Sequence, residues 1–183
     1  MYKSLLLLSQ IVSCLLFLFL TGCATHGQGS GKQFSANYAS RLPPQMDTNG
    51  KKLVLVDPSV HAWGAYNEDG TLVRAGLATA GGVKCPPDDP DELTCRTTEG
   101  TFRITSMAGG DCYSKTYPRP NGGGLMPYCM FFNNGQALHG APDQIVIEDN
   151  VSHGCVRMRI PDAEWMQNQF AQIGTKVVVR PYN

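Results

Sequence analysis

Short apolar runs alternate with turn-forming residues from residue 52 to residue 180. Lys52–Asp57 and His61–Tyr66 are two such runs separated by Pro58-Ser59, and Thr71–Thr79 is a third. Asp69-Gly70 precedes the third run, and an Asp-Gly pair between apolar stretches is typical of a β-hairpin turn. We therefore predict three consecutive short strands at the start of this region.

The same pattern continues after residue 96. Thr97–Ile104 and Met130–Phe132 have strand-like patterns, and Gln136–His139 follows Asn133-Asn134-Gly135, which is a hairpin-turn sequence. Lys176–Arg180 is a last apolar run near the end of the chain. These segments predict four further strands, one of which closes the fold.

One helix is expected at Pro161–Phe170. Proline is favoured in the first turn of a helix, and apolar residues recur at helical spacing up to Gly174, which ends the pattern. With five or more short strands and one main helix, residues 51–183 are expected to form one mostly β domain, a β-sandwich or a curled sheet.

Composition narrows the class of protein. The 183 residues include 15 basic and 15 acidic side chains, so no excess of positive charge favours a nucleic-acid partner. The length suits one domain with extensions, and 20 glycines and 12 prolines favour turns over long helices.

The first 22 residues have the pattern of an export signal. Lys3 is followed by the largely apolar run Leu5–Leu20 and a small-residue corner. Leu20-Thr21-Gly22-Cys23 is similar to the lipobox of bacterial lipoproteins, which implies that Cys23 is lipidated and becomes the mature N-terminus. A plain secretory signal that happens to precede a cysteine is the alternative.

Residues 23–50 are expected to be the lipidated cysteine and a flexible tether, because a segment so rich in Gly, Ser, Gln and Asn buries little apolar area. An ordered arm at Phe34–Pro44 is the alternative. Ala24 after the lipobox cysteine favours the outer membrane, again by resemblance to enterobacterial lipoproteins. We expect a periplasmic, lipid-anchored domain.

Candidate chemistry is concentrated in His139–Met158, which holds two of the four histidines and Cys155. A thiol becomes a strong nucleophile only as thiolate, so it needs a base or a positive field beside it. Gly154 permits a sharp turn after Ser152-His153, which could aim an amide at a developing oxyanion. A buried cysteine near two surface histidines is the alternative interpretation.

The two halves of this stretch resemble a known active-site signature. His139-Gly140, followed by Ser152-His153-Gly154-Cys155, is similar to the motif of the L,D-transpeptidases, the YkuD (ErfK/YbiS/YcfS/YnhG) family of peptidoglycan enzymes. The resemblance implies that Cys155 attacks the carbonyl of the third residue of a tetrapeptide stem and expels the terminal D-alanine. It further implies that His139 is the general base, oriented by the Gly140 carbonyl, and that His153 assists.

The resemblance also indicates residues around the substrate. The amides of Gly154 and Cys155 are candidate oxyanion donors, and Ser152 is expected to shape the corner. Arg157 matches the family motif and either binds a substrate carboxylate or makes a structural salt bridge. Tyr128 and Met126 lie in a segment that covers the cleft in the family, and Gly122–Gly124 is either a mobile lid or a surface loop.

Seven cysteines are present, of which Cys14 leaves with the signal, Cys23 takes lipid and Cys155 is the nucleophile. The remaining four allow three connectivities in an exported protein, and we favour Cys85–Cys95 and Cys112–Cys129 because each pair closes one insertion. A zinc site using His139, His153, Cys155 and another cysteine is the alternative.

The expected reaction transfers the acyl group to an amine, giving a 3→3 cross-link or the attachment of a protein. Transfer to water or attack on an existing link would give an L,D-carboxypeptidase or endopeptidase. A catalytically silent wall-binding lipoprotein is a rival from another class. The resemblance implies no metal and no cofactor; the expected partners are stem peptides and, through the anchor, a membrane, and the chain is expected to be monomeric.

Overall fold

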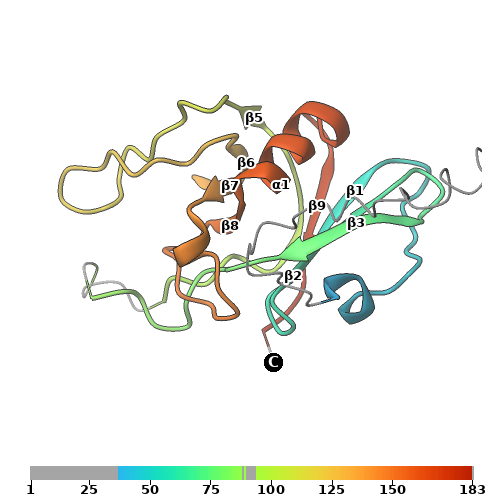
Figure 1. Cartoon of the computed structure of the whole chain (residues 1–183), viewed down its shortest axis with the longest axis horizontal. Coiled ribbons are helices and arrows are strands. Elements are labelled where there is room, and N and C mark those ends of the chain that lie inside the picture. Colours follow the sequence, from blue (N-terminus) through green and yellow to red (C-terminus); the bar gives the residue numbers. More distant parts are fainter. Residues whose placement is uncertain (1–36, 88, 90–93, 183) are drawn as a thin grey trace, which may run out of the picture. The chain divides into compact units, whose positions relative to one another are not determined.

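Two β-sheets form the body of the protein (Figure 1), and side chains from both sheets contribute to one apolar core. The structure, a computed structural model, describes residues 37–87, 89 and 94–182. The predicted signal peptide, Cys23 and the first part of the tether lie outside these residues. Within the described part of the chain, no helix is both long and apolar enough to cross a membrane.

The first sheet has the strand order β3-β2-β1-β9-β4. Its members are β1 (Leu53–Asp57), β2 (Ala62–Tyr66), β3 (Leu72–Leu77), β4 (Gly100–Arg103) and β9 (Lys176–Val179). β1, β2 and β3 form an antiparallel meander, as the turn residues predict, and β9 pairs in parallel with β1. All five segments were predicted as strands, so the apolar runs identified this sheet correctly.

The second sheet has the order β5-β6-β7-β8 and carries the residues of interest. It contains β5 (Ser106–Met107), β6 (Met130–Asn133), β7 (Gln136–Ala141) and β8 (Val156–Arg159). β6 and β7 form the predicted hairpin, whereas β7 and β8 pair in parallel across a long connection. β5 and β8 were not predicted; β8 is only four residues long and directly follows Ser152-His153-Gly154-Cys155.

The helix after β8 has the predicted extent but not a uniform geometry. α1 (Ile160–Trp165) is α-helical and continues as a π-helical turn, η3 (Met166–Phe170), in which the amide of Ala171 donates to the carbonyl of Met166 at 2.7 Å. Two short 3₁₀ turns, η1 (Tyr38–Arg41) and η2 (Asp143–Ile145), complete the elements. The fold is therefore mostly β with one short helix, as the sequence predicts.

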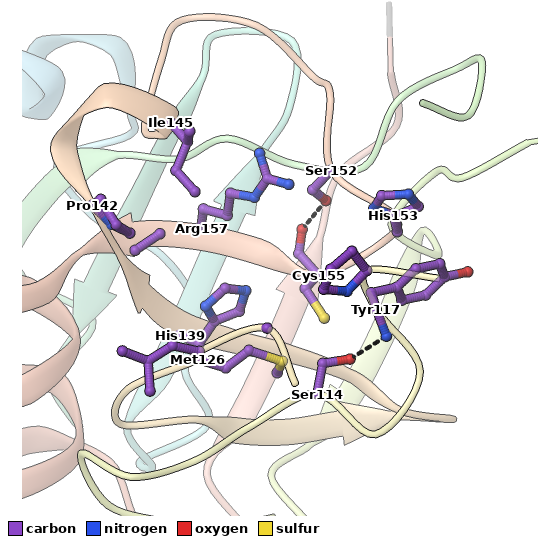
Figure 2. Close-up of a pocket in the computed structure, with 14 residues that line it drawn as sticks. Ser114, Tyr117, Met126, His139, Pro142, Ile145, Ser152, His153, Cys155 and Arg157 are labelled. Carbon is purple, nitrogen blue, oxygen red and sulfur yellow. Dashed lines mark hydrogen bonds between the residues drawn. The ribbon is translucent and has the colours of Figure 1, made fainter. Parts of the chain in front are cut away.

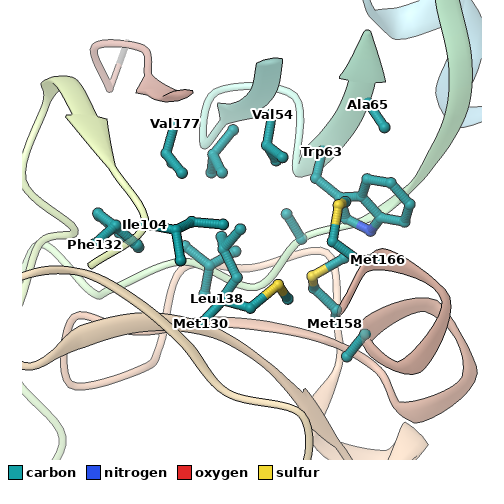
Figure 3. Packing of buried hydrophobic residues seen from close by; sticks show 14 of the residues in the cluster. Val54, Trp63, Ala65, Ile104, Met130, Phe132, Leu138, Met158, Met166 and Val177 are labelled. Atoms are coloured by element: carbon teal, nitrogen blue, oxygen red, sulfur yellow. The ribbon is translucent and has the colours of Figure 1, made fainter. Parts of the chain in front are cut away.

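The main core lies between the two sheets and the helix (Figure 3). Val54 and Trp63 from the first sheet meet Leu138 and Met158 from the second, and Met166 packs in from the helix. All of these side chains are fully buried. Burial of a large apolar side chain contributes about 1.5–3 kcal/mol, so this layer holds the second sheet rigidly against the first.

A second apolar cluster covers the opposite face of the first sheet. Tyr38 and Leu42 are buried there against Leu55 and Tyr66. This segment is also hydrogen-bonded to the sheet, because the hydroxyl of Tyr66 in β2 donates to the Pro43 carbonyl at 2.8 Å. The prediction of a flexible tether is therefore wrong for residues 37–50, and the domain begins before residue 51.

Candidate active site

The parallel pairing of β7 with β8 brings the two halves of the sequence motif together. His139 is the register partner of Arg157, and Leu138 that of Val156. Side chains alternate along a strand, so Leu138 and Val156 face the core while His139 and Arg157 share the other face. Cys155 directly precedes β8 and lines the same cavity as His139 and Arg157 (Figure 2).

A tight turn presents Cys155. Gly154 has a φ of +112°, a conformation that L side chains rarely adopt, which explains the glycine. The hydroxyl of Ser152 donates to the Cys155 carbonyl and accepts the amide of Gly154 at 3.1 Å. Ser152 therefore braces the turn, as expected. The amide of Gly154 is engaged within the turn, which differs from its predicted role as an oxyanion donor.

His139 has the predicted backbone partner. Its Nδ1 lies 2.8 Å from the carbonyl oxygen of Gly140. Because a carbonyl can only accept, Nδ1 carries the proton and Nε2 keeps a lone pair. The side chain is 6% exposed, and this burial, with a further contribution from the charge of Arg157, lowers the pKa of His139 to about 4 against the opposing effect of the Gly140 bond. The imidazole is therefore neutral at neutral pH.

Cys155 is the unpaired cysteine among the described residues. Its Sγ donates to the carbonyl of Gly135, in the β6–β7 turn, at 3.7 Å. Burial raises the pKa of the Cys155 thiol, while a backbone hydrogen bond from Ala137 and the positive charge of Arg157 act in the opposite direction. The cavity thus holds a neutral thiol and a neutral imidazole, and forming the thiolate requires a base that removes the thiol proton.

Two cavities meet at Cys155. The first, of about 350 Å³, has a largely apolar wall that includes Ile145 and also contains His139 and Arg157. The second, of about 890 Å³, is lined by more polar side chains such as Lys115 and Gln136. The two share the following wall residues: Ser114, Tyr117, Met126, His153 and Cys155. The thiol can therefore be approached from two sides.

The lid loop, residues 112–129, provides most of the shared wall. Cys112 and Cys129 are joined by a disulfide at its base, and Cys85 and Cys95 are joined in a separate segment, so both predicted disulfides are present. Within the loop, the amide of Ser114 donates to the Gly124 carbonyl at 2.8 Å. The lid loop is therefore an internally bonded structure rather than an open glycine-rich strand.

Met126 and Tyr128, the two lid-loop residues predicted to contact substrate, lie in different surroundings. Met126 lines both cavities. Tyr128 does not line either cavity; it has a φ of +57°, and its hydroxyl donates to the Glu164 carboxylate of α1 at 2.9 Å. Tyr128 therefore fastens the end of the lid loop to the helix.

Tyr117 is a wall residue that was not predicted from the sequence. Its ring stacks on the imidazole of His153 with a centroid distance of 4.1 Å, and it belongs to the wall shared by the cavities. Its position depends on how the lid loop folds back, for which the sequence carries no spacing signal. His153 is thus in contact with the lid loop, whereas His139 is on strand β7 of the sheet (Figure 2).

The described residues offer one group of side chains close enough together to share a metal ion, namely Cys85, Asp89 and Cys95. Two of these are already joined by a disulfide. The site at Cys155 instead has the parts of a nucleophilic centre: a thiol, an imidazole with a fixed tautomer and a nearby positive charge.

Comparison with known proteins agrees with this geometry. Over 140 residues the chain is 29% identical to YciB of Bacillus subtilis (strain 168), a candidate L,D-transpeptidase, and the match covers 70% of this chain and 66% of YciB. Solved structures of the same fold include an L,D-transpeptidase from Xylanimonas cellulosilytica (TM-score 0.63, 23% identity, 77% of this chain and 66% of that one).

Two further structures share the fold. They are an L,D-transpeptidase from Stackebrandtia nassauensis (TM-score 0.60, 23% identity, 76% of this chain and 60% of that one) and L,D-transpeptidase 3 from Mycobacterium tuberculosis with a faropenem-derived adduct (TM-score 0.56, 21% identity, 71% and 60%). The chain thus spans between 60% and 66% of the length of these four relatives, which is less than two thirds. The family model of the L,D-transpeptidase catalytic domain matches residues 51–179, and the chain belongs to this family.

Proposed function

We propose that this protein is a cysteine-dependent L,D-transpeptidase that acts on tetrapeptide stems of peptidoglycan. The observation that carries the proposal is the pairing of β7 with β8, which places Cys155 and a His139 with an available Nε2 in one cavity. Family membership supports the reaction class, and the two cavities suit an enzyme that binds both a donor and an acceptor.

In the first half-reaction, Nε2 of His139 accepts the Cys155 proton as Sγ attacks the carbonyl carbon of the third stem residue. The carbon–sulfur bond forms, and the carbonyl electrons move to oxygen. When the tetrahedral intermediate collapses, the bond to the D-alanine nitrogen breaks and His139 returns the proton to that leaving amine. The products are a thioester on Cys155 and free D-alanine.

The second half-reaction reverses these steps with a different amine. The acceptor amine attacks the thioester and its proton passes to His139. The carbon–sulfur bond then breaks, and His139 returns the proton to Sγ, which regenerates the thiol and the neutral imidazole. His139 exchanges a proton with both the leaving D-alanine amine and the attacking acceptor amine. Both amines must therefore bind on the side of the Cys155 thiol that faces His139. His139 lines only the smaller cavity, and we therefore assign leaving D-alanine and acceptor to that cavity and the donor stem to the larger one.

Two groups would stabilise charge. The amide of Cys155 is the remaining candidate oxyanion donor, since the Gly154 amide bonds Ser152. Arg157 favours the thiolate over the thiol and is the cation in the wall of the smaller cavity, where the carboxylate of D-alanine would leave. His153 lies at the boundary of the two cavities, where it can contact the donor without serving as the base.

The test is incubation with purified disaccharide-tetrapeptide, alone and with a second stem as acceptor, with products identified by mass. Release of D-alanine together with a 3→3 cross-linked dimer supports the proposal. Free tripeptide without a dimer would make the protein an L,D-carboxypeptidase. No change in the substrate, with folded protein, would favour a wall-binding role. Faropenem offers a second acylating reagent, because L,D-transpeptidase 3 of Mycobacterium tuberculosis carries a faropenem-derived adduct.

We also propose that the protein is exported and anchored in the bacterial envelope through Cys23, with residues 24–36 as the tether. The lipobox-like sequence supports this placement. Labelled palmitate should enter the wild-type protein and not Cys23→Ser, and equal labelling of both would contradict the anchor.

A further inference from the structure

Asp89 is a buried carboxylate outside the catalytic motif. It is 2% exposed and lies in the segment that the Cys85–Cys95 disulfide closes. Its Oδ2 accepts the hydroxyl of Tyr117 at 2.7 Å, and its Oδ1 lies 3.2 Å from Nε of Arg119. Both partners belong to the lid loop. Burying a charged carboxylate is unfavourable unless such partners replace water, so these contacts specify where the lid loop must lie.

Tyr117 carries this contact to the active site. Its hydroxyl is on Asp89, while its ring stacks on His153 at 4.1 Å with an interplanar angle of 25°. The guanidinium of Arg119 lies 5.5 Å from the centroid of the same ring. Tyr117 is thus held on three sides, and it forms wall in both cavities that meet at Cys155.

The contacts of Asp89 with Tyr117 and Arg119 therefore connect the two segments that are closed by disulfides. Cys85–Cys95 restrains the segment that supplies the acid, and Cys112–Cys129 restrains the loop that supplies the hydroxyl and the guanidinium. Asp89 belongs to none of the apolar clusters and has no contact with the sheets among its hydrogen bonds and ion pairs. Among the described residues, the hydrogen bond and the ion pair of its carboxylate both go to the lid loop, while its backbone amide donates to the Pro86 carbonyl within its own segment at 2.9 Å.

We propose that Asp89 is a positioning residue that holds Tyr117 against His153 and so fixes the wall dividing the two cavities beside Cys155. Its effect on the access of reagents to the thiol follows from geometry alone. Its effect on turnover rests on the proposed transpeptidase function, in which the donor must bind on one side of this wall and the acceptor on the other.

The test uses Tyr117→Phe and Asp89→Asn in the full chain. Tyr117→Phe keeps the ring and removes only the hydroxyl, and Asp89→Asn keeps an acceptor oxygen and removes the charge that Arg119 contacts. Asp57→Asn is the matched control, because Asp57 is also buried (4% exposed) and bonded to an arginine, Arg180, at 3.0 Å. Neither Asp57 nor Arg180 lines the cavities.

The first measurement is the rate of Cys155 alkylation by a bulky maleimide relative to iodoacetamide, read on the peptide that contains Cys155. Tyr117→Phe and Asp89→Asn should each raise this ratio by about fivefold, the factor in an equilibrium constant that corresponds to loss of one net hydrogen bond. Asp57→Asn should leave the ratio unchanged. An unchanged ratio in both folded variants, or an equal rise in Asp57→Asn, would overturn the proposal. Near-ultraviolet circular dichroism establishes that each variant is folded.

The second measurement separates positioning from chemistry. With the tetrapeptide donor, Tyr117→Phe and Asp89→Asn should raise KM several-fold and change kcat less, since His139 and Cys155 are unchanged. An equal loss of kcat at unchanged KM would contradict a positioning role. If no variant and no wild-type protein turns over the donor, the transpeptidase proposal fails, and the alkylation ratio still decides the role of Asp89.

Discussion

Replacing His139 by glutamine should remove a strong acid sensitivity from the stability of this protein. The folded imidazole has a pKa of about 4, against the usual 6.5, mainly because it is buried. The unfolded chain therefore binds a proton at a higher pH than the folded one. Below about pH 6.5 this difference favours unfolding, and the penalty grows until the folded imidazole also becomes protonated near pH 4.

The size of the effect follows from that difference in pKa. Moving the pKa from 6.5 to about 4 corresponds to about 3 kcal/mol of unfolding free energy that is fully present above pH 6.5. About 2 kcal/mol of it should already be lost at pH 5. Glutamine does not titrate, so His139→Gln should lack this component, while all other acidic and basic groups remain the same in both proteins.

The assay is urea unfolding of the wild type and His139→Gln, with disulfides intact, at intervals from about pH 7.5 to pH 4. The difference in unfolding free energy between the two proteins should shift by about 3 kcal/mol in favour of the variant as the pH falls. A difference that stays constant over this range would refute the buried, neutral imidazole and the general-base role built on it.

Three further predictions concern other parts of the site and its support. His139→Ala should abolish acylation of Cys155 by tetrapeptide donor, whereas His153→Ala should leave slow acylation detectable by mass; the opposite result would assign the base to His153. Ser152→Ala should cost about 1–3 kcal/mol of stability in urea unfolding and lower kcat, because it leaves the Gly154 amide and the Cys155 carbonyl without their partner. Leu42→Ala should cost about 2–5 kcal/mol if residues 37–50 pack as observed, and a change near zero would show that this arm is loose.

Local pattern was sufficient to predict most strands, whereas the roles expected for the motif residues came from the resemblance to the L,D-transpeptidases. Apolar runs bounded by turn residues identified β1, β2, β3 and β9. β1 and β2 are buried over their whole length, β9 is buried at alternate positions, and β3 is buried only at its last two residues. The Gly140 partner of His139 was expected from the same resemblance, and because it is the adjacent residue the contact depends little on the rest of the fold.

The remaining features depend on contacts between distant segments. The parallel pairing of β7 and β8 aligns His139 with Arg157 across a long connection, and β8 is too short to show a pattern of its own. Residues 37–50 are polar on average and largely exposed or half-buried, and the two buried apolar side chains, Tyr38 and Leu42, anchor the arm on the sheet. Tyr117 reaches His153 through the path of the lid loop, which no local spacing encodes.

The most direct test of the central claim is the intact mass of the protein during the first turnovers with a tetrapeptide donor. The wild type should gain the mass of the donor minus that of D-alanine, and digestion should place this gain on the peptide that contains Cys155. Cys155→Ser should show no such gain and no release of D-alanine. Release of D-alanine by Cys155→Ser at the wild-type rate, or a donor-derived adduct on a different residue, would contradict the assignment of Cys155 as the nucleophile.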